Sequence, residues 1–262
     1  MRPDRANSGR ILGSLLRWIA YAILLWVGVT AGAVLALRWL NPVTSAFMLT
    51  ARAQAALARD AAYRTDYRWV SLERISPHVA LAVIASEDQL FPFHDGFDLS
   101  SIRSAVRASE HGKRLRGAST ISQQVAKNLF LWSGRSFVRK GLEAWFTVLI
   151  EAMWPKERIL EVYLNIVQFG KGLYGVEAAS QHYFHEPASR LTSPQSALLA
   201  AVLPNPIRLR VDRPSRYVES RREWILGQMR GLGGPSYLKA MERESLARRE
   251  SPAHREPPVH RH

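Results

Sequence analysis

The chain has 262 residues, of which 47% are hydrophobic and 22% charged, and its formal net charge is +14. This composition is too apolar for a disordered chain, and the length accommodates one sizeable domain with short appendages. Because the chain has no cysteine, disulfides, thiolate nucleophiles and Cys-ligated zinc are excluded. The positive charge indicates an anionic partner, and nucleic acid, acidic lipid headgroups and a phosphorylated substrate are the candidates.

An uncharged run of twenty residues, 18–37, lies near the N-terminus. A helix of this length spans the roughly 30 Å hydrocarbon core of a bilayer. Basic residues dominate segment 1–17, so the positive-inside rule predicts that this segment is cytoplasmic and that the chain after the span lies outside the cytoplasm. A cleaved signal peptide is the alternative, because Ala31-Gly32-Ala33 resembles a cleavage site, but the run is longer than a typical signal sequence and favours a single-pass anchor.

The rest of the chain is predicted to be mostly α-helical, with almost no strand alternation. Residues 41–66 are interpreted as a connecting segment with a helix over 46–64, residues 67–244 as the folded domain, and the polar, proline-bearing residues 245–262 as a disordered tail. Apolar residues at helical spacing, punctuated by prolines, predict four helices in the domain, over residues 119–131, 137–154, 156–167 and 192–203.

Glu87 and Asp88 form the first candidate group, at the end of the apolar run V-A-L-A-V-I-A-S. Burial raises the affinity of a carboxylate for protons and suits it to general base catalysis. A helix-end carboxylate that pairs with a surface arginine is the alternative. His94, with Asp95 and Asp98, allows a metal cluster, although an oriented core histidine is the preferred interpretation.

Thr120, Gln124 and Lys127 form the second group, because their spacing places them on one face of a predicted helix. A hydroxyl, an amide and an ammonium group together suit an anionic or sugar ligand. An ordinary solvated helix face is the alternative.

Arg139, Lys140 and Glu143 form the third group, again on one helix face. Two cations and a carboxylate suit a diphosphate, with the carboxylate either orienting the cations or sharing a divalent ion; a helical ion pair is the alternative. The whole segment 99–140 has nine basic residues and one acid, interleaved with apolar residues. It therefore predicts a folded basic surface, which also suits anionic lipid; nucleic acid is not expected.

Five strings of residues occur in the order typical of the peptidoglycan glycosyltransferase family, which the chain resembles over about residues 67 to 210, most closely in its monofunctional branch. They are E-D-Q-L-F-P-F-H-D-G-F-D (87–98), G-A-S-T-I-S-Q-Q-V-A-K-N-L-F-L (117–131), R-K-G-L-E-A-W-F (139–146), K-E-R-I-L-E-V-Y-L-N (156–165) and L-L-A-A-V-L-P-N-P (198–206). An S-x-x-K match at 236–239 stands without the other transpeptidase motifs, so no cross-linking activity is expected.

The resemblance implies a lysozyme-like, largely helical domain on one N-terminal transmembrane helix, in the bacterial inner membrane with the domain in the periplasm. It implies polymerisation of lipid II by inverting transfer from a chain linked to undecaprenyl diphosphate. The implied partners are these substrates, membrane lipid and other cell-wall synthesis or division proteins. A membrane-bound muramidase or lytic transglycosylase, which would cleave the same glycan, is the main alternative, and a non-catalytic scaffold is a third.

The resemblance also implies roles for individual residues. Glu87 is similar to the general base, and Glu143 to the group that manages the departing diphosphate, with Mg²⁺ or another divalent cation as cofactor. The implied substrate-contacting or site-shaping residues are Asp88, Phe91, His94, Thr120, Gln124, Lys127, Arg139 and Lys140. Residues 99–116 correspond to a mobile, membrane-contacting segment, and Gln168 and Gln195 stand where the family pattern has an acid.

Overall fold

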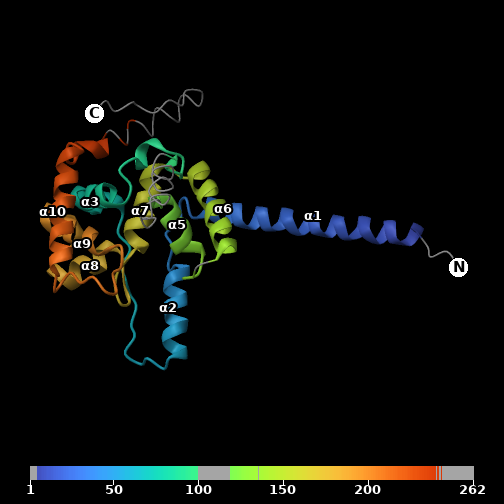
Figure 1. Ribbon diagram of the computed structural model, residues 1–262, viewed down its shortest axis with the longest axis horizontal. Helices are drawn as coiled ribbons and strands as arrows, with labels where there is room; N and C mark the ends of the chain where they lie inside the picture. Colours follow the sequence, from blue (N-terminus) through green and yellow to red (C-terminus); the bar gives the residue numbers. More distant parts are fainter. Residues whose placement is uncertain (1–4, 100–118, 135, 240, 242, 244–262) are drawn as a thin grey trace, which may run out of the picture. The chain divides into compact units, whose positions relative to one another are not determined.

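The computed structural model describes residues 5–99, 119–134, 136–239, 241 and 243, and it is mostly helical as predicted (Figure 1). The chain divides into two compact units, residues 1–40 and 41–262. The expected membrane-contacting segment, apart from Leu99, and the expected tail lie outside the described residues. The α-helices are α1 Arg5–Ala36, α2 Ala46–Leu57, α3 Pro77–Glu87, α5 Ile121–Phe130, α6 Phe137–Met153, α7 Lys156–Ile166, α8 Val176–Phe184, α9 Ser193–Val202 and α10 Arg216–Gly231.

The first unit contains the long helix α1. Its segment Gly13–Ala36 is long and apolar enough to cross a membrane, and no other helix among the described residues passes that test. The predicted span, 18–37, overlaps this segment and ends one residue beyond α1. This apolar helix indicates membrane anchoring.

Helix α3 is a buried helix of the second unit. Proline at its first position suits the start of a helix, and every residue from Val79 to Ala85 is buried. A helix that is apolar on all sides must be covered on all sides. Helices α9 and α10 pack against it, and this packing brings the end of α3 next to α10 (Figure 1).

Helices α5, α6 and α7 form a second group, in which α5 packs against both of the others. Thr120 caps α5 through a reciprocal capping box with Gln123, and Ser136 caps α6 by accepting from the Arg139 N–H. These two helices, with α7 and α9, confirm the four predicted helices to within two residues at each end.

Two predictions need correction. Helix α2 ends at Leu57 rather than Arg64, because Arg59 takes a left-handed conformation with φ of 53° and the Asp60 carboxylate accepts the Ala62 N–H in a local turn. The chain also contains a small sheet that the sequence did not reveal. Its strands have only two or three residues each, too few to display an alternating pattern.

The sheet has the order β1-β3-β2, formed by β1 Asp66–Tyr67, β2 Gln168–Gly170 and β3 Leu173–Tyr174. Strand β3 pairs in parallel with β1, where Asp66 is opposite Leu173, and antiparallel with β2. Gly172 lies in the turn with φ of +73°, and a Cβ there would lie 2.0 Å from the Arg64 carbonyl oxygen. The sheet therefore requires glycine at this position. Among the described residues, 3₁₀ turns also occur at Leu72–Arg74, Phe91–Phe93 and Ala188–Arg190.

Candidate active site

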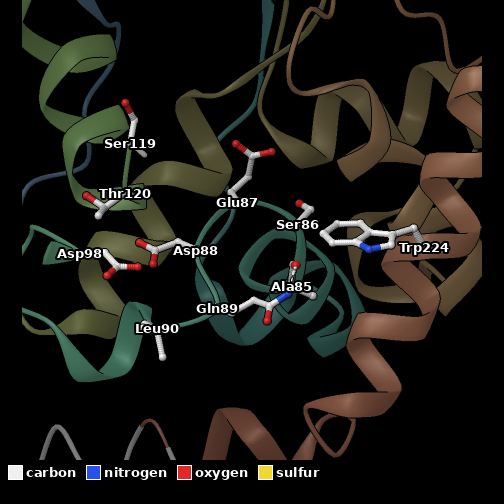
Figure 2. Close-up of a pocket in the computed structure, with 10 residues that line it drawn as sticks. All are labelled: Ala85, Ser86, Glu87, Asp88, Gln89, Leu90, Asp98, Ser119, Thr120 and Trp224. Carbon is white, nitrogen blue, oxygen red and sulfur yellow. Dashed lines mark hydrogen bonds between the residues drawn. The ribbon is translucent and has the colours of Figure 1, made fainter. Parts of the chain in front are cut away.

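Glu87 is the last residue of α3 and lies at the wall of a cavity of about 340 Å³. Its carboxylate points away from that of Asp88, although the two residues are adjacent in the chain (Figure 2). The helix ends here because Asp88 leaves the helical conformation. The cavity is lined by Ala85, Ser86, Glu87, Asp88, Gln89, Leu90, Asp98, Ser119, Thr120 and Trp224.

The Glu87 carboxylate has one partner on each oxygen. The Gln124 Nε2 amide donates to Oε2 at 3.1 Å, and a guanidinium nitrogen of Arg221 lies 3.4 Å from Oε1. Burial raises the pKa of Glu87, while the Gln124 hydrogen bond and the charges of Arg221 and Lys127 oppose the rise. A raised pKa and an oxygen with spare lone pairs are the properties of a general base.

Asp88 makes structural contacts instead. It accepts the Ile121 N–H, at the start of α5, at 2.9 Å, and its other close partner is His94 Nε2 at 2.9 Å. The Gly96 N–H donates to His94 Nδ1, so Nε2 carries the hydrogen that Asp88 accepts. This geometry matches the preferred interpretation of an oriented histidine. No group of three His, Asp, Glu or Cys residues that could hold a metal occurs within the described part of the chain.

Thr120 lines the cavity, as its predicted place near a ligand requires, but it lies just before α5 rather than within it. It precedes α5 as its N-cap and is buried, and its hydroxyl donates to the Gly96 carbonyl at 2.7 Å while accepting from the Gln123 N–H. Its hydroxyl therefore joins α5 to the segment that carries His94. Phe91 is fully buried beside the same segment, so both residues support the shape of the site.

Gln124 and Lys127 do lie on one face of α5, as predicted. The Gln124 side chain that donates to Glu87 also accepts from the Tyr163 hydroxyl at 3.2 Å. Burial lowers the pKa of Lys127, an effect opposed by the Glu143 and Glu87 carboxylates. Helix α5 thus carries a cation that both acidic centres influence.

Glu143 lies on α6 in a different environment. It is 3% exposed, and its two oxygens accept from Arg139 at 2.8 Å and from Lys140 at 2.5 Å. Because both oxygens already contact cations, the described residues around Glu143 do not fit a bound divalent ion, and we derive no step through a metal. The Lys140 side chain is half exposed, so a charge remains available to an anionic ligand.

Two residues of α10, Arg221 and Trp224, were not found from the sequence. Arg221 pairs with Glu87, and Trp224 lines the cavity (Figure 2). The helical spacing of Val218, Ile225 and Met229, which are all buried, could have predicted helix α10. Nothing in the sequence, however, connects this helix to Glu87. Tyr163, which contacts Gln124, was missed for the same reason.

The helical domain, with a buried acid at one cavity and a cationic cluster on the neighbouring helices, has the features of an enzyme that acts on an anionic substrate. The transglycosylase family profile matches residues 54–230. The chain belongs to this family.

Relatives named "Biosynthetic peptidoglycan transglycosylase" match nearly the whole chain. The protein from Pectobacterium carotovorum is 52% identical over 241 residues, which cover 92% of this chain and 98% of the relative. Those from Klebsiella oxytoca and Xanthomonas campestris are 55% and 51% identical, and each alignment covers 86% of this chain and 92% of the relative.

Proposed function

We propose that this protein, a peptidoglycan glycosyltransferase, polymerises lipid II with Glu87 as the general base. The observation that carries the proposal is the contrast between two buried acids. Both oxygens of Glu143 are bound by cations at 2.8 and 2.5 Å, whereas Glu87 faces a cavity and has only the longer contacts to Gln124 and Arg221. Of these two acids, only Glu87 lines the cavity, where a substrate hydroxyl can reach it.

In the proposed reaction, the 4-hydroxyl of GlcNAc in lipid II attacks the anomeric carbon of a glycan chain linked to undecaprenyl diphosphate. Glu87 takes the hydroxyl proton as the new C–O bond forms. The bond to the diphosphate oxygen breaks on the opposite face, so the anomeric configuration inverts. Undecaprenyl diphosphate leaves with the bond electrons.

The departing diphosphate requires charge stabilisation more than a proton donor. Lys140 and Lys127 supply this positive charge. Arg139 forms an ion pair with Glu143 and so fixes the position of the Glu143 carboxylate beside them. A lytic enzyme that cleaves neutral glycosidic bonds has little need for such a cluster. This favours polymerisation over the muramidase or lytic alternative.

The setting of the reaction is part of the proposal. We place the catalytic domain, residues 67–244, in the periplasm and the anchor in the bacterial inner membrane, with the N-terminus cytoplasmic and other cell-wall synthesis or division proteins as partners. A requirement for Mg²⁺ or another divalent cation stays a prediction. It is tested by loss of activity in EDTA and recovery on readdition of the ion.

The test of the base is Glu87→Gln in the detergent-solubilised full-length protein, with labelled lipid II as substrate and products resolved on a gel. General base catalysis contributes typically 10²- to 10⁴-fold, so we expect polymerisation to fall by about that factor. Gln keeps the shape of the side chain and cannot take a proton.

The matched control is Glu223→Gln, which removes an exposed carboxylate from α10 and should leave the rate unchanged. Near wild-type polymerisation by Glu87→Gln would refute the base assignment. Cleavage of preformed glycan by the wild type, without polymerisation, would establish the lytic alternative.

A further inference from the structure

Helix α10 contributes a cation to the Glu87 cavity from a distant part of the chain. Arg221 is 134 positions from Glu87 in sequence, yet one of its guanidinium nitrogens lies 3.4 Å from Glu87 Oε1. The two side chains are only 21% and 15% exposed. A charge pair in such a setting is weakly screened by solvent.

Arg221 is positioned by a contact within α10 and by the packing of that helix. Its guanidinium lies 5.8 Å from the centre of the Trp224 ring, one turn further along α10. Helix α10 is joined to the residues just after Glu87 by a hydrogen bond from Gln89 Nε2 to Gln228 Oε1 at 2.9 Å. Beyond the end of α10, the Tyr237 hydroxyl donates to the Gln89 carbonyl at 2.7 Å. The position of the cation relative to the carboxylate is therefore built into the packing of α10.

The contact between Arg221 and Glu87 is longer than a typical hydrogen bond between a cation and a carboxylate. Hydrogen bonds between cations and carboxylates are usually about 2.7 to 2.9 Å long, and the Arg139–Glu143 contact, at 2.8 Å, is one of them. At 3.4 Å, Arg221 supplies positive charge to Glu87 while making only a weak hydrogen bond. Oε1 thus keeps lone-pair capacity for the proton of an incoming hydroxyl.

Three charged groups of the described chain act on Glu87. Asp88, immediately after α3, opposes its ionisation, whereas Lys127 on α5 and Arg221 on α10 favour it. Gln124 donates a neutral hydrogen bond, and the buried Tyr163 hydroxyl on α7 lies behind Gln124. Lys127 also interacts with Glu143, so Arg221 is the cation most specific to Glu87 among the described residues.

We propose that Arg221 is the positioning residue that keeps Glu87 ionised and its Oε1 available to the acceptor hydroxyl. This inference rests on the proposed function, in which Glu87 is the base. Arg221 acts through Glu87 and takes no proton itself.

The test compares Arg221→Met, Arg221→Lys and the control Arg222→Met, each as the full-length protein in detergent with lipid II. Met keeps an apolar stem against Trp224 but removes the charge, which should raise the pKa of Glu87. We expect the acid limb of the kcat/KM profile to move to higher pH by about one unit, an approximately tenfold loss on that limb, with recovery at high pH.

Arg221→Lys should return the acid limb towards its wild-type position. Arg222→Met removes the same charge from the neighbouring residue, which pairs with Glu219 and Glu223 rather than Glu87, and should leave the profile unchanged. A uniform loss in Arg221→Met at every pH, with an unmoved limb, would overturn the inference.

A second readout is independent of turnover. The pKa of Glu87 is followed by ¹³C NMR of labelled glutamate carboxyls, assigned with Glu87→Gln, in the wild type and in Arg221→Met. A higher pKa in the variant supports the inference, and coincident titrations overturn it. Failure of the proposed function would instead appear as an active Glu87→Gln, so the two failures are distinguishable.

Discussion

Glu87 and Glu143 are the same residue type in different surroundings, and the surroundings determine their chemistry. Glu143 is bound by two cations within its own helix, and it stabilises them as much as they stabilise it. Glu87 is buried beside a cavity with looser partners from two other helices. A carboxylate in the second setting costs stability when ionised, a common feature of catalytic groups.

This cost predicts a pH-dependent stability difference. Burial raises the pKa of Glu87 in the folded protein, so its destabilising effect is present at neutral pH and disappears as the pH falls through the unfolded value of about 4.3. Glu87→Gln should therefore unfold at a higher temperature than the wild type at pH 7, and the difference should vanish by about pH 4. Thermal unfolding monitored by circular dichroism provides the measurement, and an equal difference at both pH values would contradict the assigned burial effect.

The two cations beside Glu143 should respond differently to removal. Lys140 is half exposed, whereas the Arg139 side chain is 12% exposed. Lys140→Ala should change the free energy of unfolding by less than about 1 kcal/mol and lower polymerisation at least about tenfold through weaker use of the diphosphate donor. Arg139→Ala should cost about 3 kcal/mol or more, because it removes a buried partner of a buried acid.

Urea unfolding and donor-dependent kinetics separate the two effects. Unchanged kinetics in Lys140→Ala would remove Lys140 from the site, and equal stability losses in both variants would contradict the difference in burial.

At the scale of elements, the site depends on a junction between α5, α6 and the segment after α3. Gly96 lies at this junction with φ of +87°, and a Cβ there would lie 2.7 Å from Thr147 Cγ2 and 2.9 Å from Glu151 Cγ on α6. Its carbonyl accepts from Thr120 and its N–H donates to His94. The backbone of Gly96 thus joins the capping residue of α5 to the Asp88–His94 pair.

Gly96→Ala should destabilise the fold by about 1 to 3 kcal/mol and lower activity, because the segment must move away from α6. Gly227→Ala is the matched control, since nothing lies within 4 Å of its added Cβ in the middle of α10. This control should stabilise the protein by about 0.5 to 1 kcal/mol. Denaturant unfolding measures both changes, and equal effects in the two variants would argue against a strained position at Gly96.

Gln195 illustrates how an element can accommodate a departure from the family pattern. It completes the capping box of α9 with Thr192, and its Nε2 donates to Glu186 at 2.6 Å. A glutamate could serve the capping box but could not donate to Glu186. Gln168 similarly donates to the Gly170 carbonyl in the small sheet. Both glutamines have local structural partners, so neither departure requires a change in the chemistry at Glu87.

At the scale of the whole molecule, an apolar helix precedes a separate globular unit. The absence of cysteine allows the proposed orientation to be tested with single introduced thiols. In intact cells lacking an outer membrane barrier, Glu223→Cys should react with a membrane-impermeant maleimide, whereas Ser8→Cys should react only after the membrane is disrupted. The opposite pattern would reverse the topology, and labelling of both sites would exclude a stable single-pass anchor.

The sequence alone predicted the apolar anchor, four helices of the catalytic domain and the two acids proposed for catalysis. Each of these rests on local information: an uninterrupted apolar run, a helical period with prolines at its ends, or a motif within a few residues. The small sheet and α10 were missed because their strands were too short for a pattern and because the surface of α10 is highly charged. The early end of α2 depended on a left-handed residue that the pattern could not reveal.

Only the tertiary structure decided which side chains meet. Asp88 and Glu87 are neighbours in the chain, yet Asp88 contacts the start of α5, 33 positions away, and Glu87 contacts Arg221, 134 positions away. Both acids line the cavity. Asp88 is bound by the start of α5 and by His94, whereas Glu87 has only the longer contacts to Gln124 and Arg221. The residue types were set by the sequence, but burial and the distance to charge, which govern whether an acid can accept a proton, depend on contacts between distant segments.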